Sequence, residues 1–458
     1  MSDKPRAVFF HGGNLDNVHF GHFNPTLTLV SLLAERGYEV NYFGPLPAKS
    51  KVEGCGATFH TYGWPQWGMT QAAMHASVAL GHAPTEACVN EVLFENALPA
   101  TVGVMEFVVA QVRQLKPQLI VSDAAYPWAK LSAQVCGVPY IASLSSTYMT
   151  PEERKIVMGF VDELPVSKSA AKWLLDKYGI EYTPHNCYTN YSPYTVTWTV
   201  PEFLFPPGIG SASDVPDFVH YLGAAMLPNA CARNPSEADE AWLQSLAEKK
   251  RASGSTVVYV SMGTVFGQER WTADNGSLLR FYDAVCKALG PLPNTIVVIA
   301  AGKEASSVTA IAPEGFLVCD HTPQKQLLEQ GLVDLGLFHG GMNTTQEALC
   351  CSVPMVVMPC FGDQNMNAAR VAALGCGVHI PHPAAPGLGL DMDHVTPEVL
   401  GAAVSEISDN LPKYQAASTR MRQLFAARAK YLTDGAVDDI LSYVDKFDAG
   451  AAAVATKL

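Results

Sequence analysis

Long apolar runs are missing from this sequence of 458 residues. No stretch of about 18 apolar residues occurs, which is the length that a transmembrane helix needs. The N-terminal residues Met1–Arg6 also lack the apolar segment and the small-residue cleavage site of a secretory signal peptide. We therefore expect a soluble, cytoplasmic protein without a membrane span.

Cysteine occurs without a recognisable pattern. None of the 11 cysteines forms a C-x-x-C pair, and the adjacent Cys350 and Cys351 cannot both serve an ordinary zinc site. We interpret the cysteines as buried, reduced thiols of a cytosolic protein. The string Asp391-Met392-Asp393 has the form of a metal-binding D-x-D motif, but it precedes Thr396-Pro397, a typical helix cap and start. The sequence therefore predicts neither a metal nor a cofactor.

Positive charge is scarce as well. The chain has 30 Lys and Arg against 43 Asp and Glu, and the basic residues form no cluster. Because a net charge of −13 repels phosphate backbones, no nucleic-acid partner is expected. What the sequence does have is 48% hydrophobic residues, enough to build buried sheets. Its length exceeds one typical core, so two or three domains are predicted.

Short β-branched or aromatic runs alternate with helical patterns, which predicts a parallel α/β fold. In the first half, such runs occur at residues 7–10, 39–43 and 119–122. In the second half, they occur at residues 256–261, 295–300, 315–318, 334–338 and 353–358. Two doubly wound sheets follow. The domain boundary is expected near residues 230–252, where a polar, proline-containing stretch precedes a charged helix.

A histidine near the first predicted helix has the character of a general base. Asn24 is expected to cap a helix whose first residue is Pro25, and His22 precedes that helix. The positive end of a helix disfavours imidazolium, and a neutral histidine is suited to accept a proton at cellular pH. Two other histidines are rival candidates for the same role, His11 and His19.

The second half contains a candidate anion site. Residues 338–349 are typical of a strand end, a glycine-rich turn and a helix N-terminus, which together present backbone N–H groups to a phosphate. The glycines allow close approach of a diphosphate. Additional side-chain donors are available from His339, Asn343 and Thr344. Thr344 and Glu347 also have the T-x-x-E spacing of a capping box, so a purely structural role for Glu347 stays open.

A second group of polar residues follows the next predicted strand. Asp363 and Gln364 come shortly after the run at residues 353–358. Open α/β sheets bind ligands at the carboxyl ends of their strands, and carboxylate and amide groups suit sugar hydroxyls. A helix cap is the alternative interpretation of this pair.

These segments resemble the donor-binding signature of the UDP-glycosyltransferase family. The resemblance runs from His321-Thr322-Pro323-Gln324 through residues 339–347 to Asp363-Gln364, and the stretches 21–25 and 119–123 resemble the family's N-terminal motifs. It implies a GT-B fold, with two Rossmann-like domains whose parallel sheets face a central cleft. Residues 1–235 would bind the acceptor and residues 236–435 the donor, and a helix at about 436–458 would pack back on the first domain.

The resemblance also implies roles for individual residues. His22 would be the general base, oriented by Asp123, for which an N-cap is the alternative interpretation. The diphosphate would be held by His339, Gly341, Asn343 and Thr344, with Thr264 near the sugar phosphate. Gln324 would join the donor site, Glu347 would take the ribose hydroxyls, and Asp363 with Gln364 would bind the sugar. His321 stands where plant members have a tryptophan that stacks on uracil, so the identity of the donor's nucleotide base stays open.

The predicted function is inverting transfer of a hexose, with glucose suggested by Gln364, from a UDP-sugar to a small apolar or aromatic acceptor. The UDP-sugar is a co-substrate, and the acceptor residues are expected in ranges 45–118 and 150–215. A monomer or weak dimer is expected. The alternatives are a nucleotide-sugar epimerase or hydrolase of the same fold, and a non-catalytic nucleotide-sugar-binding auxiliary protein. The acceptor and the O-, N-, S- or C-linkage stay open.

Overall fold

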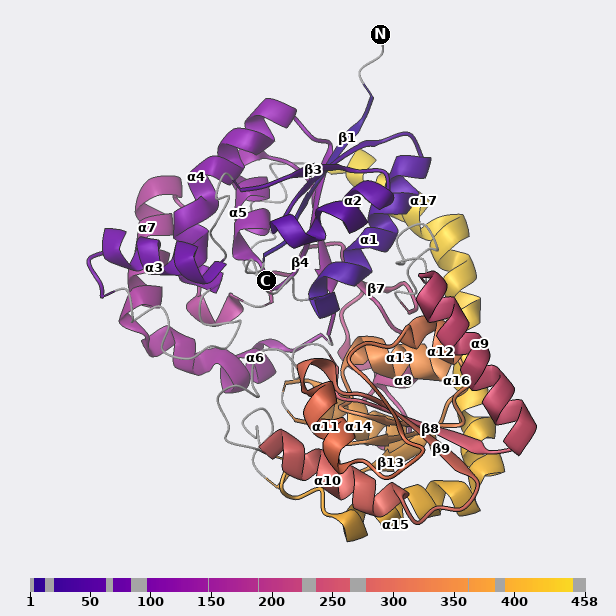
Figure 1. Cartoon of the computed structure of the whole chain (residues 1–458). Coiled ribbons are helices and arrows are strands. Elements are labelled where there is room, and N and C mark those ends of the chain that lie inside the picture. Colours follow the sequence, from indigo (N-terminus) through magenta and orange to yellow (C-terminus); the bar gives the residue numbers. More distant parts are fainter. Residues whose placement is uncertain are drawn as a thin grey trace. The chain divides into compact units, whose positions relative to one another are not determined.

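The chain forms two compact units, shown in the computed structural model of Figure 1. Unit 1 comprises Met1–Trp198, Val215–Arg233 and Tyr431–Leu458, and unit 2 comprises Thr199–Asp214 and Asn234–Lys430. The structure describes residues 4–12, 20–62, 69–83, 97–146, 148–187, 189–224, 236–263, 277–360, 362–383 and 392–447. No helix among these residues is long and apolar enough to cross a membrane.

Segment 199–214 belongs to unit 2, whereas the sequence analysis assigned it to the first domain. Its helix α8 (Pro201–Leu204) contacts helix α14 (Gln364–Ala373). The buried Arg370 Nε donates a hydrogen bond of 3.1 Å to the carbonyl oxygen of Leu204. The segment is therefore tied to unit 2 by contacts that are distant in sequence.

Within the described residues, unit 1 contains a seven-stranded parallel sheet with the order β3-β2-β1-β4-β5-β6-β7. Its strands are β1 (Arg6–Phe10), β2 (Glu39–Phe43), β3 (Thr58–His60), β4 (Leu119–Asp123), β5 (Tyr140–Leu144), β6 (Thr195–Thr197) and β7 (Val219–Tyr221). Its helices are α1 (Phe20–Glu35), α2 (Lys49–Gly54), α3 (Met69–Ala79), α4 (Ala97–Leu115), α5 (Pro127–Cys136), α6 (Pro151–Met158), α7 (Pro165–Tyr178) and α17 (Val437–Asp445).

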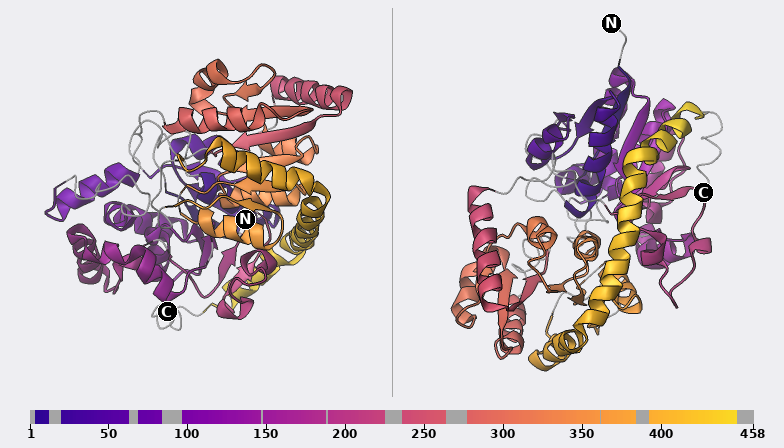
Figure 2. Two further views of the ribbon diagram at one scale, coloured as in Figure 1. Left: turned by 90° about the horizontal axis from the view of Figure 1, so that it is seen from below. Right: turned by 90° about the vertical axis from the view of Figure 1, so that its right-hand side faces the viewer.

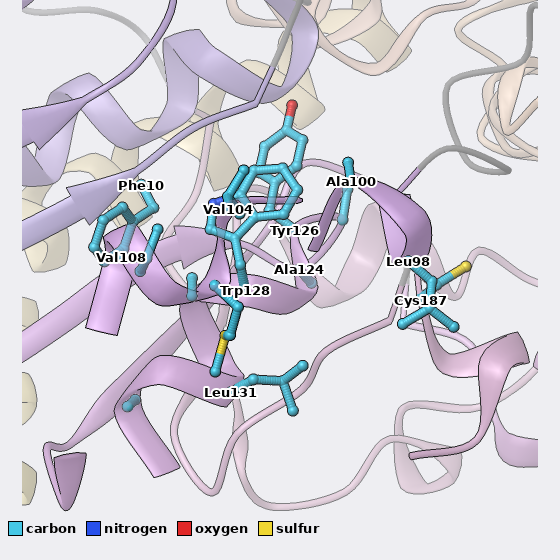
Figure 3. Packing of buried hydrophobic residues seen from close by; sticks show 14 of the residues in the cluster. Phe10, Leu98, Ala100, Val104, Val108, Ala124, Tyr126, Trp128, Leu131 and Cys187 are labelled. Carbon is cyan, nitrogen blue, oxygen red and sulfur yellow. The ribbon is translucent and has the colours of Figure 1, made fainter. Parts of the chain in front are cut away.

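Both faces of this sheet are covered by helices (Figure 2) because successive side chains of each strand point to opposite sides. On one face, Phe10 packs in a cluster with residues of α4 and α5, among them Val104 and Trp128 (Figure 3). On the other face, Phe9 belongs to a cluster with residues of α1 and α17, including Ile440. The C-terminal helix α17 therefore packs on unit 1.

The described part of unit 2 contains a six-stranded parallel sheet with the order β10-β9-β8-β11-β12-β13. The strands are β8 (Thr256–Ser261), β9 (Thr295–Ala300), β10 (Leu317–Cys319), β11 (Leu335–Phe338), β12 (Met355–Val357) and β13 (Gly377–His379). Besides α8 and α14, its helices are α9 (Glu237–Ser253), α10 (Ser277–Leu289), α11 (Ala305–Ile311), α12 (Gln324–Glu329), α13 (Met342–Cys350), α15 (Pro397–Asp409) and α16 (Leu411–Tyr431). The predicted α/β class with two Rossmann-like parallel sheets is confirmed.

Helix α1 begins earlier than the sequence analysis expected. It starts at Phe20 and contains Pro25, so the expected start at Pro25 with Asn24 as the cap is wrong. Pro25 lies inside the helix and has no N–H to donate to the carbonyl of Gly21, so the additional turn forms with one helical hydrogen bond fewer. His22 therefore lies in the first turn of the helix, where the positive end of the helix dipole acts on its ring.

Among the described residues, one cysteine differs from the expectation. Cys55 is disulfide-bonded, so the interpretation of the cysteines as reduced thiols is wrong for this residue. Cys350 and Cys351 are among the free cysteines of the described residues. Spacing along the chain does not reveal which cysteines approach each other in the fold, which explains the error.

Removing the side chain of Ile440 should destabilise unit 1. Ile440 is 1% exposed in the cluster that joins α17 to the sheet, so Ile440→Ala should lower the free energy of unfolding by about 2–5 kcal/mol. The matched control is Ile156→Ala, because Ile156 is 84% exposed in the same unit. Urea unfolding measures both variants, and equal, small effects would contradict the packing of α17 on unit 1.

Candidate active site

The carboxyl ends of neighbouring strands in unit 1 bring three polar side chains together. His22 lies in the first turn of α1, Asp123 is the last residue of β4, and Ser145 follows β5. His22 Nδ1 lies 3.1 Å from Asp123 Oδ1 and 2.8 Å from Ser145 Oγ. The predicted pair of His22 and Asp123 is therefore in hydrogen-bonding contact, and Ser145 is an additional partner.

The carboxylate of Asp123 is held rigidly in a buried position. Its residue is 2% exposed, and Oδ1 accepts a hydrogen bond of 2.9 Å from the backbone N–H of Ala125. The alternative that Asp123 caps a helix is wrong, because α5 starts at Pro127 and its N-cap residue is Tyr126. A buried carboxylate needs hydrogen-bond donors, and an N–H of the His22 ring supplies one. This bond fixes the ring orientation and favours the tautomer with its proton on Nδ1.

Neither rival histidine is established as a competing base. His11 is completely buried, with its ring centroid 5.2 Å from that of Phe23 and 5.1 Å from that of Tyr126. An acceptor could not reach this ring without displacing the core. His19 lies outside the described residues.

A small polar cavity lies directly beside the His22–Asp123 pair. Its volume is about 10 Å³, roughly the space of one water molecule. The lining residues are Asp123, Ala124, Leu144, Ser145, Ser146, Thr189 and Tyr191. Among them, Asp123 Oδ2 and Thr189 Oγ1 are buried oxygens that have no hydrogen-bond partner within the described residues. Such oxygens favour a ligand group that donates hydrogen bonds.

In unit 2, the chain leaves β11 through His339-Gly340-Gly341 and enters α13 directly. Gly341 occupies the N-cap position without a side-chain cap, so the capping-box interpretation of Thr344 and Glu347 is wrong. The first helical hydrogen bond joins Thr345 N–H to the carbonyl of Gly341. The preceding backbone N–H groups therefore point out of the helix end, as an anion site requires.

The His339 ring fits between two glycines at this helix start. A Cβ atom would lie 2.5 Å from the ring at Gly263, which has φ +76°, and 2.4 Å from it at Gly341. Burial lowers the pKa of His339 to about 4. Because burial outweighs the backbone hydrogen bond with Ser261, which raises the pKa, the ring is neutral at neutral pH. Its Nδ1 is a buried atom with no hydrogen-bond partner within the described residues.

The side chain of Glu347 is half-buried and is held by a partly buried hydrogen-bond network. Gln324 Nε2 donates a hydrogen bond of 2.7 Å to Glu347 Oε2, and the same nitrogen lies 3.4 Å from Thr344 Oγ1. The hydroxyl of Tyr259 on β8 donates a hydrogen bond of 3.1 Å to Gln324 Oε1 and lies 2.7 Å from Thr322 Oγ1. Burial raises the pKa of Glu347, and the hydrogen bond from Gln324 opposes that shift. The predicted residues Gln324, Thr344 and Glu347 are thus brought together.

Asp363 and Gln364 lie at the start of α14, and part of their hydrogen-bonding capacity serves the protein itself. Gln364 Oε1 accepts a hydrogen bond of 2.8 Å from the backbone N–H of Cys360. Asp363 Oδ2 accepts 3.1 Å from Asn367 Nδ2, which also donates 3.0 Å to the carbonyl of Gly340. Asp363 occupies the N-cap position but makes no side-chain cap. Asn367 therefore links this pair to the glycine-rich turn.

The remaining predicted residues are exposed, half-buried or outside the described residues. His321 is exposed directly after β10 and Asn343 is half-buried in α13, whereas Thr264 lies outside the described residues. In the D-x-D string, Asp391 is also outside them, and Asp393 forms a two-pronged ion pair with Arg280 at 2.9 and 3.0 Å. Among the described residues, no group of three His, Cys, Asp or Glu could hold a metal ion.

Sequence reasoning missed three residues of these sites, Ser145, Tyr259 and Asn367. Ser145 follows a strand end, where a polar residue could have been singled out by the rule used for Asp123. Tyr259 lies inside a β-branched run and was counted only as a strand residue. Asn367 comes one helical turn after Asp363, a spacing that places both on one face of a helix.

The chain is similar to known glycosyltransferases in sequence and in fold. A family model described as UDP-glucoronosyl and UDP-glucosyl transferase matches residues 226–392, which contain every predicted donor-binding residue. The chain is 26% identical over 425 residues to an uncharacterized UDP-glucosyltransferase, YdhE, of Bacillus subtilis (strain 168), covering 88% of this chain and 91% of that protein. It is also 26% identical over 382 residues to the NDP-glycosyltransferase YjiC of the same organism, covering 81% and 85%.

These matches support membership of the UDP-glycosyltransferase family. Solved structures share its fold. The glycosyltransferase of kitacinnamycin has a TM-score of 0.70 at 22% identity and covers 96% of this chain and 99% of that one. The calicheamicin glycosyltransferase CalG4 has a TM-score of 0.67 at 18% identity, with 97% and 99% coverage. This glycosyltransferase therefore has the GT-B fold that the sequence predicted.

A methyl group at residue 341 should displace the His339 ring. Because a Cβ would lie 2.4 Å from Nε2, Gly341→Ala should weaken UDP binding by about tenfold, the effect of losing one hydrogen bond to a charged group. Gly401→Ala is the control, since no atom lies within 4 Å of a Cβ built there. Isothermal titration calorimetry with UDP measures both. An unchanged dissociation constant for Gly341→Ala would contradict a diphosphate site at this turn.

The neutral state of His339 should make stability depend on pH. Its folded-state pKa of about 4 lies below the ordinary 6.5, so the unfolded chain binds the proton more readily. The stability that depends on neutral His339 is complete above pH 6.5 and is lost as the pH falls toward 4. His339→Gln should therefore reduce the slope of unfolding free energy against pH in this window.

Urea unfolding at a series of pH values measures this slope. His321→Gln is the control, because it removes an exposed histidine of the same unit and should keep the wild-type slope. Identical slopes for the wild type and His339→Gln would show that His339 is protonated equally in both states.

Proposed function

We propose that this glycosyltransferase moves glucose from UDP-glucose to a hydroxyl group of a small aromatic acceptor, with inversion of the anomeric carbon. The observation that carries this proposal is the contact of 3.1 Å between His22 Nδ1 and Asp123 Oδ1 beside a polar cavity. A hydroxyl group is a weak nucleophile, so transfer needs a base at the acceptor. A histidine oriented by a buried carboxylate is suited to that task.

In the proposed reaction, His22 Nε2 takes the proton of the acceptor hydroxyl while its oxygen attacks the anomeric carbon. The new carbon–oxygen bond forms as the bond between that carbon and the diphosphate breaks, and UDP leaves with the bonding electrons. Asp123 keeps the proton on Nδ1 and stabilises the imidazolium that forms. The Ser145 hydroxyl, 2.8 Å from Nδ1, restricts rotation of the ring. Attack opposite the leaving group converts an α-linked donor into a β-glycoside.

In the proposed donor site, dipoles stabilise the negative charge of the leaving diphosphate. The N-terminus of α13 carries a partial positive charge, and the neutral His339 ring adds an N–H donor. Glu347 is proposed to bind the ribose, Asp363 and Gln364 the sugar, and His321 the base. The reaction is written without a metal or cofactor, with the UDP-sugar as co-substrate. The name UDP-glucosyltransferase of the Bacillus subtilis relative YdhE supports glucose as the sugar.

An aromatic acceptor is supported by the composition of the cavity wall. Tyr191 lines the cavity, and its ring centroid lies 4.9 Å from that of Tyr148. The cavity itself has room for about one water molecule, but the half-buried ring of Tyr148 lies next to it, and such a flat ring favours stacking of a planar acceptor. The name demethyllactenocin mycarosyltransferase, of a Streptomyces fradiae relative that is 25% identical over 369 residues, supports a natural-product acceptor.

Loss of the His22 ring should abolish transfer but spare donor binding. His22→Ala should lower kcat for glucoside formation by about 10²- to 10⁴-fold, the usual effect of a general base, and leave the dissociation constant for UDP unchanged. Asp123→Asn should lower kcat as well, because an amide cannot stabilise the imidazolium. The assay follows glucoside mass and UDP release from UDP-glucose with a panel of phenols, in the presence of a chelator.

The control for this experiment is His185→Ala. His185 Nδ1 contacts Asp162 Oδ2 at 2.7 Å in the same unit, and its side chain is 17% exposed, as is that of His22. It reproduces the chemical change at a histidine–aspartate pair away from the cavity. UDP release without glucoside in the wild type would indicate a hydrolase. Full glucoside formation by His22→Ala would refute His22 as the base.

A further inference from the structure

The hydrogen-bond network around Glu347 has only one self-consistent direction. A carboxylate accepts hydrogen bonds, so the Gln324 group 2.7 Å from Glu347 Oε2 is the amide NH₂. The opposite end of that amide is Oε1, which must accept from the hydroxyl of Tyr259 at 3.1 Å. Tyr259 then accepts at its oxygen from Thr322, 2.7 Å away. The direction of every hydrogen bond in the network therefore follows from the Glu347 carboxylate, which can only accept.

This network joins three segments that follow or form separate strands. Tyr259 is 1% exposed in the middle of β8, Thr322 and Gln324 follow β10, and Glu347 lies in α13. Burial raises the pKa of Tyr259 to about 12, so its hydroxyl keeps its proton at any physiological pH. The amide of Gln324 consequently has a permanent donor on its oxygen side and cannot flip without breaking two hydrogen bonds.

One oxygen of Glu347 is occupied by this arrangement and the other is not. Gln324 holds Oε2, and no hydrogen bond to Oε1 occurs within the described residues. Because Gln324 fixes the orientation of the Glu347 carboxylate, the position of Oε1 is fixed as well. A fixed acceptor can bind the vicinal hydroxyls of a ribose, whereas a 2′-deoxyribose offers it only one.

We propose that Tyr259 is a positioning residue that makes the donor site select ribonucleoside diphosphates over their 2′-deoxy counterparts. This inference rests on the proposed donor site and adds a determinant of nucleotide choice to it. Tyr259 acts through Gln324, since no contact of its own with the nucleotide is required. Loss of the tyrosine hydroxyl frees the Gln324 amide to rotate, and Glu347 loses its fixed orientation.

The test is isothermal titration calorimetry of the full chain with UDP and with 2′-deoxy-UDP. The wild type should bind UDP about tenfold more tightly, the contribution of one hydrogen bond to a charged group. Tyr259→Phe should lose about fivefold to tenfold in UDP affinity and bind 2′-deoxy-UDP within about twofold of the wild type. The ratio of the two affinities then approaches one. A loss of general packing would weaken both nucleotides together.

The matched control is Tyr282→Phe, which removes another buried tyrosine hydroxyl of unit 2. Tyr282 bonds to the backbone carbonyl of Ala300 at 3.4 Å and takes no part in the network. It should keep the wild-type ratio. Thr322→Val, which removes the donor to Tyr259, should lower the ratio in the same direction and carries the test if Tyr259→Phe does not fold. Thermal unfolding checks the fold of each variant.

Each remaining outcome has a definite meaning. A wild type that binds UDP but shows no preference over 2′-deoxy-UDP would overturn the inference and leave the donor site intact. So would a Tyr259→Phe protein that retains the wild-type ratio, or one that loses affinity for both nucleotides equally. A wild type that binds neither nucleotide would overturn the proposed donor site, and the inference with it.

Discussion

The parallel arrangement of the strands in the described part of the chain is the constraint on which both sites depend. In a parallel sheet, the carboxyl ends of all strands lie along one edge, so residues far apart in sequence meet there. In unit 1 this edge joins His22, Asp123 and Ser145, which are separated by up to 123 positions. In unit 2 it joins the residues after β10 with the glycine-rich turn after β11. The chemistry is concentrated where the topology places strand ends together.

In each site, neutral donors hold a carboxylate that is buried, as in Asp123, or half-buried, as in Glu347. Asp123 is bound by the backbone N–H of Ala125 and by the ring of His22, and Glu347 is bound by the amide of Gln324. Such partners orient a carboxylate and leave its charge available, whereas a salt bridge would neutralise it. His339 is likewise uncharged, because burial lowers the pKa of its ring to about 4. Orientation by dipoles is the common feature of both units.

Strand ends and glycine-rich turns leave local signals, which predicted the α/β class and the two sheets, and the resemblance to a known family predicted the pairing of His22 with Asp123. Tertiary contacts leave no such local signals, so predictions that depended on them were wrong or could not be made. Segment 199–214 joined unit 2 through Arg370, and helix α1 extended past Pro25 to Phe20. Tyr259 looked like an ordinary core residue, since its hydroxyl finds Gln324 only after the chain has folded.

The central claim is a single displacement at the anomeric carbon with His22 as the base beside Asp123. The configuration of the product tests it most directly. Proton NMR of the glycoside formed from UDP-α-glucose reports the anomeric coupling and therefore the configuration. The account predicts a β-glycoside as the sole product of the wild-type enzyme. An α-glycoside would contradict it, because retention requires a different mechanism from direct attack by a base-activated hydroxyl.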